Sequence, residues 1–553
     1  GRGFVSLIMT VTRRVTASRS LSGAVVGGIC GTAALAAWLF LPKLDYLPDG
    51  NRNLVFGVIV PPPGYNLAMT TKIAKDIENE IRPLWAEVTG SEPEPGGPPK
   101  IKHFFFVARS DRTFLGAASA QPERVKELIP VLRKPAFREP GTFGFINVRS
   151  LFGRHVGGSR SVELNISGPN MEDNLNVAVR AVGLLERVMP RDKGTQVRPR
   201  PGLELGGPEV RVIPDRVKLA DSGVSARELG NTLDAYNDGL RVTEITVDGR
   251  RMDLTLIGKI GEVTETQDVS QFPVVTRDGT IVPAGMLGRI DVTVGATEIR
   301  HPERVRTVTL DIRPPEEMPL EVAIDAIRSQ VIDGLISQGV PGGVKMRVGG
   351  TADKLTETWN HMSWNLLLAV VIVFLVMAML FESFIYPLVI ILSVPVAAAG
   401  GVLGLALLNL KVFQPLDMLT LLGFVILVGI VVNNAILVVH QTLVHIREEG
   451  MAANDAVLEA THNRIRPIFM STLTSVFGMA PLVLFPGAGS ELYRGLGSVV
   501  IGGLSLSALL TLAIIPPLLS LVAGAHEDRR AAAAKAAARA DAQAKRLKKK
   551  PAE

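Results

Sequence analysis

The sequence predicts an α-helical transmembrane bundle of six spans joined to a large water-facing domain of α+β subdomains. Six long stretches contain no Asp, Glu, Lys or Arg and reach the roughly 20 residues that a helix needs to cross a hydrocarbon core. Between the first and the second stretch, from residue 42 to residue 362, no segment is apolar enough to span. The composition agrees with this mixture, because 47% of the 553 residues are hydrophobic while 20% are charged.

The first apolar stretch, Leu21–Leu41, is predicted to be a transmembrane helix within residues 21–42. The basic residues before it also fit a signal peptide, which is the alternative. The stretch is long for such a peptide, however, and the residues after it offer no small-residue cleavage site. Glycine recurs at Gly23, Gly27 and Gly31, a spacing typical of closely packed membrane helices. We therefore expect this helix to belong to the bundle.

The other five spans form a block at residues 363–523, after the water-facing domain. They are predicted at Ser363–Phe381, Phe384–Leu410, Met418–His440, Pro467–Phe485 and Leu496–Val522. Proline and glycine within them are tolerated in a packed bundle, because neighbouring helices can satisfy the freed backbone groups. An even number of spans places both chain ends on the same side of the membrane.

Basic residues concentrate on one side of the predicted spans. With a cytoplasmic amino end, the cytoplasmic segments are residues 1–20, the turn Glu382-Ser383, residues 441–466 and a basic tail at 524–553. From residue 526 to residue 553 there are nine Lys or Arg and four Asp or Glu, whereas the basic residues of the short outer loops are only Lys411 and Arg494. The positive-inside rule therefore places the large domain outside the cytoplasm, which in a bacterium with two membranes is the periplasm.

Strands and amphipathic helices alternate in the water-facing domain. We expect strands at Asn53–Val60, Lys102–Val107, Thr113–Ala118, Ser161–Ile166, Arg306–Ile312 and Val344–Val348, and helices at Ala68–Val88, Met171–Met189 and Leu320–Ile336. The region Gly207–Asp291 contains its own strands and helix and interrupts one of these units. Repeated strand–helix–strand units predict several small α+β sandwiches side by side.

Two adjacent amides, Asn433 and Asn434, lie within the apolar span Met418–His440. A polar pair in a lipid-spanning helix is costly unless another group satisfies it. The pair therefore indicates either helix packing or a transport pathway, and this helix alone leaves both interpretations open. Val438, farther along the same helix, is expected to face lipid.

Several stretches resemble one family, the resistance–nodulation–division (RND) efflux pumps, and in particular the carboxy-terminal half of an AcrB-like pump of the hydrophobe/amphiphile type. The membrane stretches that carry the resemblance are FESFIYP from Phe381, GIVVNNAILVV around the amide pair, RIRPIFM from Arg464 and PGAGS from Pro486. In the water-facing domain, Glu209–Gly223 followed by Ser225–Leu233 resembles the family's docking subdomain. The similarity extends from about residue 21 to residue 523.

The resemblance implies a homotrimeric pump of the bacterial inner membrane that couples proton influx to drug export. It also implies two porter subdomains of ferredoxin-like fold, at 51–160 and at 161–206 plus 292–357, with a docking subdomain at 207–291 between them. Pumps of this type have two similar halves, so a missing amino-terminal half is expected in the same polypeptide or as a second chain. The other implied partners are a periplasmic adaptor protein and an outer-membrane channel. Apart from the resemblance, the basic tail is either a solvated, partly helical extension or a contact with the anionic head groups of membrane lipid. The proton-motive force takes the place of a cofactor.

Proton coupling needs a group that titrates within the membrane, and the interiors of the six spans contain no acid and no lysine. In the family, the titrating acids belong to the other half. This half usually contributes a Lys at the position of Asn433, followed by an Asn that Asn434 matches. Because Asn433 cannot carry a charge, it departs from the pattern. The resemblance implies that both amides orient or hydrogen-bond the acids.

The same resemblance extends to the next span. Arg464 matches an Arg near the family's proton route, and Ser471 and Thr472 are expected to hydrogen-bond to the acids. For each hydroxyl the alternative is a hydrogen bond to the carbonyl groups of its own helix.

Phenylalanines gather where the family's first porter subdomain contributes them to a drug pocket. They are Phe104, Phe105, Phe106 and Phe114. Aromatic walls suit varied apolar and amphiphilic ligands, since area and shape matter there more than directed hydrogen bonds. The alternative is that these side chains fill a sandwich core. Successive residues of a strand point to opposite faces, so at least one of three consecutive phenylalanines must leave that core.

A metal-exporting relative is the alternative within the family. Such a pump would use clustered Met or Cys, the soft ligands of Cu(I). The methionines of the water-facing domain are widely separated along the chain, and the single cysteine, Cys30, lies in an apolar stretch. The sequence therefore favours amphiphilic organic compounds and predicts no metal site.

A non-transporting membrane scaffold is the alternative from another class. A scaffold has no need for Asn433-Asn434 or for Arg464 in its bundle, and their presence favours a transporter. No GxxxxGK[ST] loop is found, which argues against an ATP-driven pump, and no hydrolytic constellation predicts an enzyme. The basic tail has no aromatic or folded platform beside its charge, so nucleic acid is not an expected partner.

The charge asymmetry gives a testable topology with six spans, both ends cytoplasmic, and residues 42–362 outside. Cysteines introduced as Ser91→Cys and Ala532→Cys should be labelled by an impermeant reagent from opposite sides of the membrane. Labelling of both positions from the same side would contradict this topology.

Overall fold

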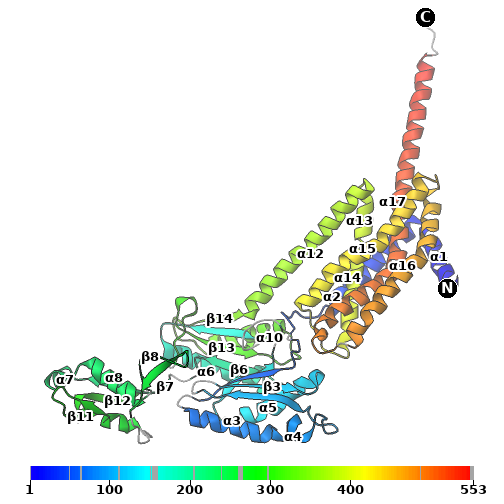
Figure 1. Ribbon diagram of the computed structural model, residues 1–553. Coiled ribbons are helices and arrows are strands. Elements are labelled where there is room, and N and C mark those ends of the chain that lie inside the picture. The colour runs from blue at the N-terminus through cyan, green and yellow to red at the C-terminus, as the bar shows by residue number, and fades with distance from the viewer. Residues whose placement is uncertain are drawn as a thin grey trace.

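The computed structural model describes residues 2–48, 50–62, 65–109, 113–149, 151, 160–203, 206–237, 239–258, 266–295, 298–485 and 487–548. A bundle of long helices meets a mixed α/β region at one end (Figure 1). At its other end the last helix extends beyond the bundle towards the carboxyl terminus. We call these the α/β end and the basic end of the bundle.

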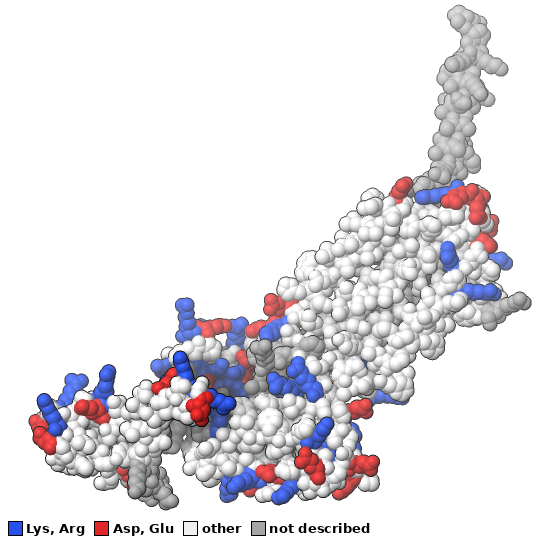
Figure 2. Space-filling view, in the orientation of Figure 1, with Lys and Arg blue, Asp and Glu red and all other residues white. Residues whose placement is uncertain are grey.

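Among the described residues, six helical segments are long and apolar enough to cross a membrane, as the sequence predicts. They are α2 (Arg19–Phe40), α12 (Thr351–Phe381), α13 (Ile385–Ile391) continuing as α14 (Ser393–Asn409), α15 (Met418–Arg447), α16 (Ala453–Leu484) and the first part of α17 (Arg494–Lys548). Charged side chains gather near the two ends of the bundle, and the visible face between them is almost free of charge (Figure 2). This distribution is the one that a hydrocarbon layer requires.

Two helices at the basic end differ from the prediction. Helix α1 (Arg2–Thr16) occupies what was expected to be a plain amino-terminal segment, and it packs beside α16, where the Phe4 and Phe469 rings meet edge to face at 5.0 Å. Helix α16 begins at Ala453, well before the predicted start at Pro467, and continues through that proline. The first turns of α16 carry charged side chains, so a search for apolar runs does not find this part of the helix.

Glycines let α14 and α17 approach closely at the centre of the bundle. A Cβ atom on Gly502 would lie 2.5 Å from the Gly400 carbonyl oxygen, and one on Gly404 would lie 2.6 Å from the Ser498 carbonyl oxygen. Real Cβ atoms do not come this close to a backbone oxygen, so only glycine permits this crossing. Helices α15 and α16 pack against the same α17.

The first α/β unit is a four-stranded antiparallel sheet with helices on one face. Its strands are β1 (Val55–Val60), β2 (Ile101–Val107), β3 (Thr113–Ser119) and β4 (Phe143–Val148), in the order β2-β3-β1-β4. Helices α3 (Leu67–Ile81) and α5 (Leu128–Ala136) supply Ile77 and Leu132 to the fully buried core beneath the sheet.

The helix predicted at Ala68–Val88 is shorter than expected. Helix α3 ends at Ile81, and a separate short helix, α4 (Ala86–Thr89), follows. The chain between them, Arg82–Leu84, forms a 3₁₀ turn, and the extended conformation of Trp85 (φ −71°, ψ 122°) then separates the two helices. Strand β4 and helix α5 were not predicted.

The second unit has the same strand order and a split sequence. Its strands are β5 (Val162–Ser167), β6 (Gln196–Arg200), β13 (Thr307–Arg313) and β14 (Lys345–Gly350), in the antiparallel order β14-β5-β13-β6. Helices α6 (Met171–Val188), α10 (Leu320–Ala326) and α11 (Asp333–Ser337) cover one face. The two sheets meet where the Gln196 amide accepts from the Ile146 N–H at 2.8 Å and donates to the Ile146 carbonyl at 3.3 Å.

An inserted unit separates β6 from β13 and projects away from the bundle (Figure 1). Strands β7 (Gly207–Pro214) and β12 (Gly288–Gly295) pair along their whole length and carry the chain out and back. The outer part contains α7 (Arg216–Asp221), α8 (Ala226–Asn237), β10 (Pro273–Val275), β11 (Ile281–Pro283) and α9 (Ala284–Leu287) around its own small core. It also contains a hairpin, β8 (Leu240–Val247) with β9 (Arg250–Leu256), which is almost entirely exposed.

The α/β region is joined to the bundle by the chain that leaves α2. The Asp45 N–H donates to the Leu416 carbonyl at 3.1 Å, and the Met418 N–H donates to the Tyr46 carbonyl at 3.0 Å, so this linker pairs with the start of α15. Arg160 adds a buried ion pair to Asp45 at 2.9 Å. The start of α15 is therefore tied to the water-facing region.

Asp417 caps α15 at this junction. Its carboxylate accepts from the Thr420 N–H at 2.8 Å and from the Gln414 amide at 2.9 Å, and only 1% of the residue is exposed. Burial, with a further contribution from the Asp45 charge, raises the pKa of Asp417 from its ordinary 3.8 to about 6. The folded state therefore favours the protonated carboxyl group.

Asp417→Asn should change how stability depends on pH. A carboxyl pKa that is higher in the folded state favours folding at low pH, and this contribution is lost as the pH rises through about 6. The melting temperature of the wild type relative to the variant should thus fall between about pH 4 and pH 7. The exposed substitution Asp325→Asn is the control, and a pH-independent difference for Asp417→Asn would contradict the burial argument.

Candidate functional site

Helix α15 gives the two predicted amides different surroundings. Adjacent residues of a helix point about 100° apart. Asn434 is 5% exposed and lies in the bundle, whereas Asn433 is exposed. Only one of the two amides is therefore covered by this chain.

Helix α16 contributes the two predicted hydroxyls. The Ser471 hydroxyl donates to the Ile468 carbonyl of its own helix at 3.0 Å, the alternative considered above. The Thr472 hydroxyl is buried and has no hydrogen-bond partner in the part of the chain that the structure describes. Thr472 thus retains a free hydrogen-bonding capacity inside the bundle, and Ser471 does not need a partner elsewhere.

Arg464 lies nearer the basic end than the amides. Its guanidinium donates to the Gln441 side-chain oxygen across the α15–α16 contact at 2.7 Å. Gln441 is seven residues beyond Asn434, about 10 Å along a helix that rises 1.5 Å per residue. The structure therefore places Arg464 on the same pair of helices as the amides but about two turns away.

One face of α15 and much of α16 are uncovered. On α15 the exposed apolar residues Leu422, Ile426 and Ile430 lead to Asn433. On α16 Met470, Leu473 and Phe477 are between 49% and 70% exposed. Apolar side chains can face lipid, but an amide there is unfavourable. Asn433 therefore marks the part of this surface that calls for a polar neighbour.

The expectation that Val438 faces lipid is wrong. Val438 is fully buried, in a cluster with Val439, Leu512 and Ile515. In a helix that is apolar nearly all round, periodicity does not separate the lipid-facing side from the protein-facing side.

The predicted phenylalanines lie on both faces of the first sheet. Phe104 and Phe106 pack against the core beneath the helices, whereas Phe105 is 43% exposed on the opposite face. Phe114 is on that opposite face too, where its ring stacks with Phe56 at 6.1 Å. Strand alternation thus assigns two of the four side chains to a structural core and leaves two for contact with a ligand.

Sequence reasoning missed other aromatic residues of the same face. Phe143 and Phe145 of β4 alternate with the core residue Ile146, and Phe145 lies beneath the Arg198 guanidinium at 5.8 Å. The period of two in FGFINV was the available signal. The outer face of this sheet is therefore aromatic and is bordered by arginine from the second unit.

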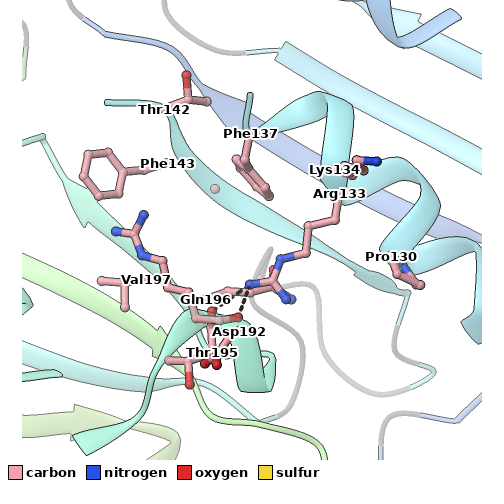
Figure 3. Close-up of a pocket in the computed structure, with 12 residues that line it drawn as sticks. Pro130, Arg133, Lys134, Phe137, Thr142, Phe143, Asp192, Thr195, Gln196 and Val197 are labelled. Carbon is pink, nitrogen blue, oxygen red and sulfur yellow. Dashed lines mark hydrogen bonds between the residues drawn. The ribbon is translucent and has the colours of Figure 1, made fainter. Parts of the chain in front are cut away.

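A cavity of about 450 Å³ opens where the two units meet (Figure 3). Phe137 and Phe143 flank it, and Arg133 reaches from α5 to the chain before β6, where it donates to the Thr195 carbonyl at 2.9 Å. Arg191 lies over the Phe143 ring at 5.3 Å. Burial and the Arg191 charge lower the pKa of Arg133. The cavity combines aromatic surface with a concentration of positive charge.

In the part of the chain that the structure describes, His, Cys, Asp and Glu side chains form no ligand set for a metal. Within the described residues, no three of these groups lie close enough together to hold an ion. Cys30 is a single free thiol in α2.

The six spans, the two sheets of equal topology and the polar residues of α15 and α16 agree with one sequence family. The AcrB/AcrD/AcrF family matches residues 9–523, nearly the whole chain. The chain belongs to this family of RND efflux transporters. It is accordingly a multi-pass protein of the bacterial inner membrane with six candidate spans, and its family is one of transporters rather than enzymes.

Its curated relatives are about twice as long. The multidrug resistance protein MdtC of Klebsiella pneumoniae (strain 342) is 28% identical over 537 residues, which cover 93% of this chain and 49% of the relative. MdtC of Erwinia tasmaniensis is 31% identical over 313 residues, covering 56% and 30%. This member of the AcrB/AcrD/AcrF family thus spans about half the length of the relatives that it matches.

Solved structures share the fold. The crystal structure of a heavy metal efflux pump aligns with a TM-score of 0.74 over 94% of this chain and 52% of that chain, at 20% identity. At this identity the likeness extends to the fold alone.

The buried amide gives a prediction for the assembled AcrB/AcrD/AcrF-type transporter. Interhelical hydrogen bonds in membranes contribute about 0.6–1.7 kcal/mol, so Asn434→Ala should lower the transport rate by about 3- to 15-fold. Leu375→Ala on α12, where the side chain is 55% exposed, is the control, because Val438 is unsuitable. If the two substitutions had equal effects in a transport assay, the result would favour the interpretation that the amides serve only in helix packing.

Proposed function

We propose that this chain is one half of a proton-driven pump that exports amphiphilic and hydrophobic compounds from the periplasm and the inner membrane. The observation that carries the proposal is the exposed amide of Asn433 at membrane depth, beside the uncovered faces of α15 and α16. Lipid is a poor neighbour for an amide, whereas a second helical half with polar groups would cover it.

The complementary half would supply the titrating carboxylates. The spans of this chain carry no acid or lysine in their interiors, so a proton needs a binding site from elsewhere. We expect Asn433, Asn434 and Thr472 to orient or hydrogen-bond such acids, with Arg464 farther along the proposed route. The half would be part of the same polypeptide or a second chain. The proton-motive force, rather than a cofactor, would drive export.

The water-facing units fit porter and docking roles. We assign the ferredoxin-like porter subdomains to the two sheets of order β2-β3-β1-β4 and β14-β5-β13-β6, and the docking subdomain to the inserted unit. The exposed β8–β9 hairpin offers a surface for neighbouring copies in a homotrimer. A periplasmic adaptor protein and an outer-membrane channel would complete the tripartite complex.

Amphiphilic compounds are favoured over metal ions as substrates. The outer face of the first sheet presents Phe56, Phe105 and Phe114, and the neighbouring cavity adds Phe143 and arginine. Such walls suit apolar bodies with a polar or anionic group. One protein of the same fold is a heavy metal efflux pump, and a metal-exporting pump is therefore the second candidate. A non-transporting scaffold would leave the polar residues of the bundle without a role.

Drug tolerance separates these candidates. In a susceptible host, the assembled pump should raise tolerance to dyes and detergents and leave copper and silver tolerance unchanged. Phe105→Ala with Phe114→Ala should reduce the effect for bulky aromatic compounds, whereas the core substitution Phe104→Leu, a near-volume-conserving change, should not. Tolerance to copper and silver alone would favour the metal-exporting candidate, and no change with a folded, assembled protein would favour the scaffold.

A further inference from the structure

A buried histidine outside the amide site is connected to Arg464 by a chain of hydrogen bonds. Arg464 contacts the Gln441 oxygen at 2.7 Å, the Gln441 nitrogen contacts His445 Nε2 at 3.1 Å, and His445 Nδ1 contacts a Glu449 carboxylate oxygen at 2.7 Å. The three residues 441, 445 and 449 are spaced by four, which places them on one side of α15 and its continuation. Only 7% of the His445 side chain is exposed, whereas 52% of the Glu449 side chain is.

The hydrogen-bonding capacities of these groups fix the direction of every bond. A guanidinium only donates, so Gln441 must present its oxygen to Arg464. The Gln441 NH₂ group then points to His445 Nε2, which must accept and therefore carries no hydrogen. The hydrogen of the neutral imidazole is on Nδ1 and is donated to Glu449. This assignment follows from the chemistry of arginine and does not depend on which way an amide is drawn.

Protonation of His445 is incompatible with this arrangement. Adding a hydrogen at Nε2 makes both ring nitrogens donors, so the NH₂ group of Gln441 would face another donor. Turning the amide gives its oxygen to the imidazolium but presents its NH₂ group to the guanidinium of Arg464. In any one orientation, the Gln441 oxygen can therefore accept from the protonated His445 or from Arg464, but not from both.

The charged groups around His445 are few. Glu449 forms its ion pair, and Arg464 on α16 faces it through Gln441. Arg447 and Glu448 follow it on its own chain segment and are exposed. Among the described residues, no other charged side chain hydrogen-bonds or forms an ion pair with His445. The Met451 N–H donates to the His445 carbonyl at 3.0 Å, and this hydrogen bond fixes the backbone beyond α15.

We propose that His445 is a positioning residue that holds or releases Arg464 through the Gln441 amide, according to whether its imidazole is neutral or protonated. The inference rests on the proposed proton-driven function, in which Arg464 supports the proton route. Uptake of one proton forms the Nε2–H bond, and the Glu449 carboxylate balances the resulting charge. The Gln441 amide then turns, and Arg464 is free to move. Loss of the proton restores the first arrangement.

Arg464 itself reports the coupling without any need for transport. The measurement is the ¹⁵N NMR spectrum of the full chain in lipid bilayers, with ¹⁵N-labelled arginine. The Arg464 signal is identified as the one that is missing from the spectrum of the Arg464→Lys variant. It should change when the pH is lowered and His445 takes up a proton. His445→Asn should abolish the change. Gln441→Glu should abolish it as well, because a carboxylate accepts from Arg464 and from a protonated His445 at once. His440→Gln, an exposed histidine on the same helix, should retain it.

Drug-dependent proton flux through the assembled pump gives the second readout. The flux of the wild type and of His440→Gln should depend on the pH at the basic end. His445→Asn and Gln441→Glu should flatten this dependence, a result that a purely structural role would not produce. A pH-dependent Arg464 signal that survives both substitutions, or flux profiles of the wild-type shape in both variants, would overturn the inference. Absence of proton flux from the wild type, with the Arg464 coupling intact, would instead overturn the proposed function and the transport role of His445 with it.

Discussion

Hydrogen bonds must be satisfied inside a hydrocarbon layer, and this constraint governs how α15 is built. The helix is apolar almost throughout, so each polar side chain on it needs a specific neighbour. Gln441 and His445, at the basic end of the helix, hydrogen-bond to Arg464 and Glu449, while Asn434 is enclosed by the bundle. Asn433 is the exposed amide among them. The same requirement that explains the internal contacts of α15 therefore points to a missing polar neighbour on its outer face.

The position of α15 makes its polar residues mechanically relevant. At the α/β end, Asp417 caps it and the linker after α2 pairs with the residues before it. Farther along, it packs on α17, which crosses α14 at glycine-only distances. At the basic end its side chains reach Arg464. A displacement of this helix would thus move residues of the water-facing region as well as residues along the proposed proton route, since packed elements move as rigid bodies rather than deform.

The spans and most strands could be predicted from the sequence because hydrophobic length and alternation are local signals. Strand alternation likewise required that one of Phe104, Phe105 and Phe106 leave the core, and it is Phe105. Helix α1 escaped prediction because it is amphipathic and short. The environment of Val438 escaped because an apolar helix looks alike from lipid and from protein. The spacing of Gln441, His445 and Glu449 was visible, but the contact with Arg464 depends on how α15 and α16 cross.

The central claim is that this chain forms a proton pathway only together with a complementary half. Proton flux into liposomes under an imposed pH gradient, with and without an amphiphilic drug, tests it most directly. Liposomes that contain this chain alone should show no drug-dependent flux, because the interiors of its spans carry no carboxylate and no lysine. Adding a half that contains intramembrane carboxylates should produce it. Drug-dependent proton flux from this chain alone would contradict the account.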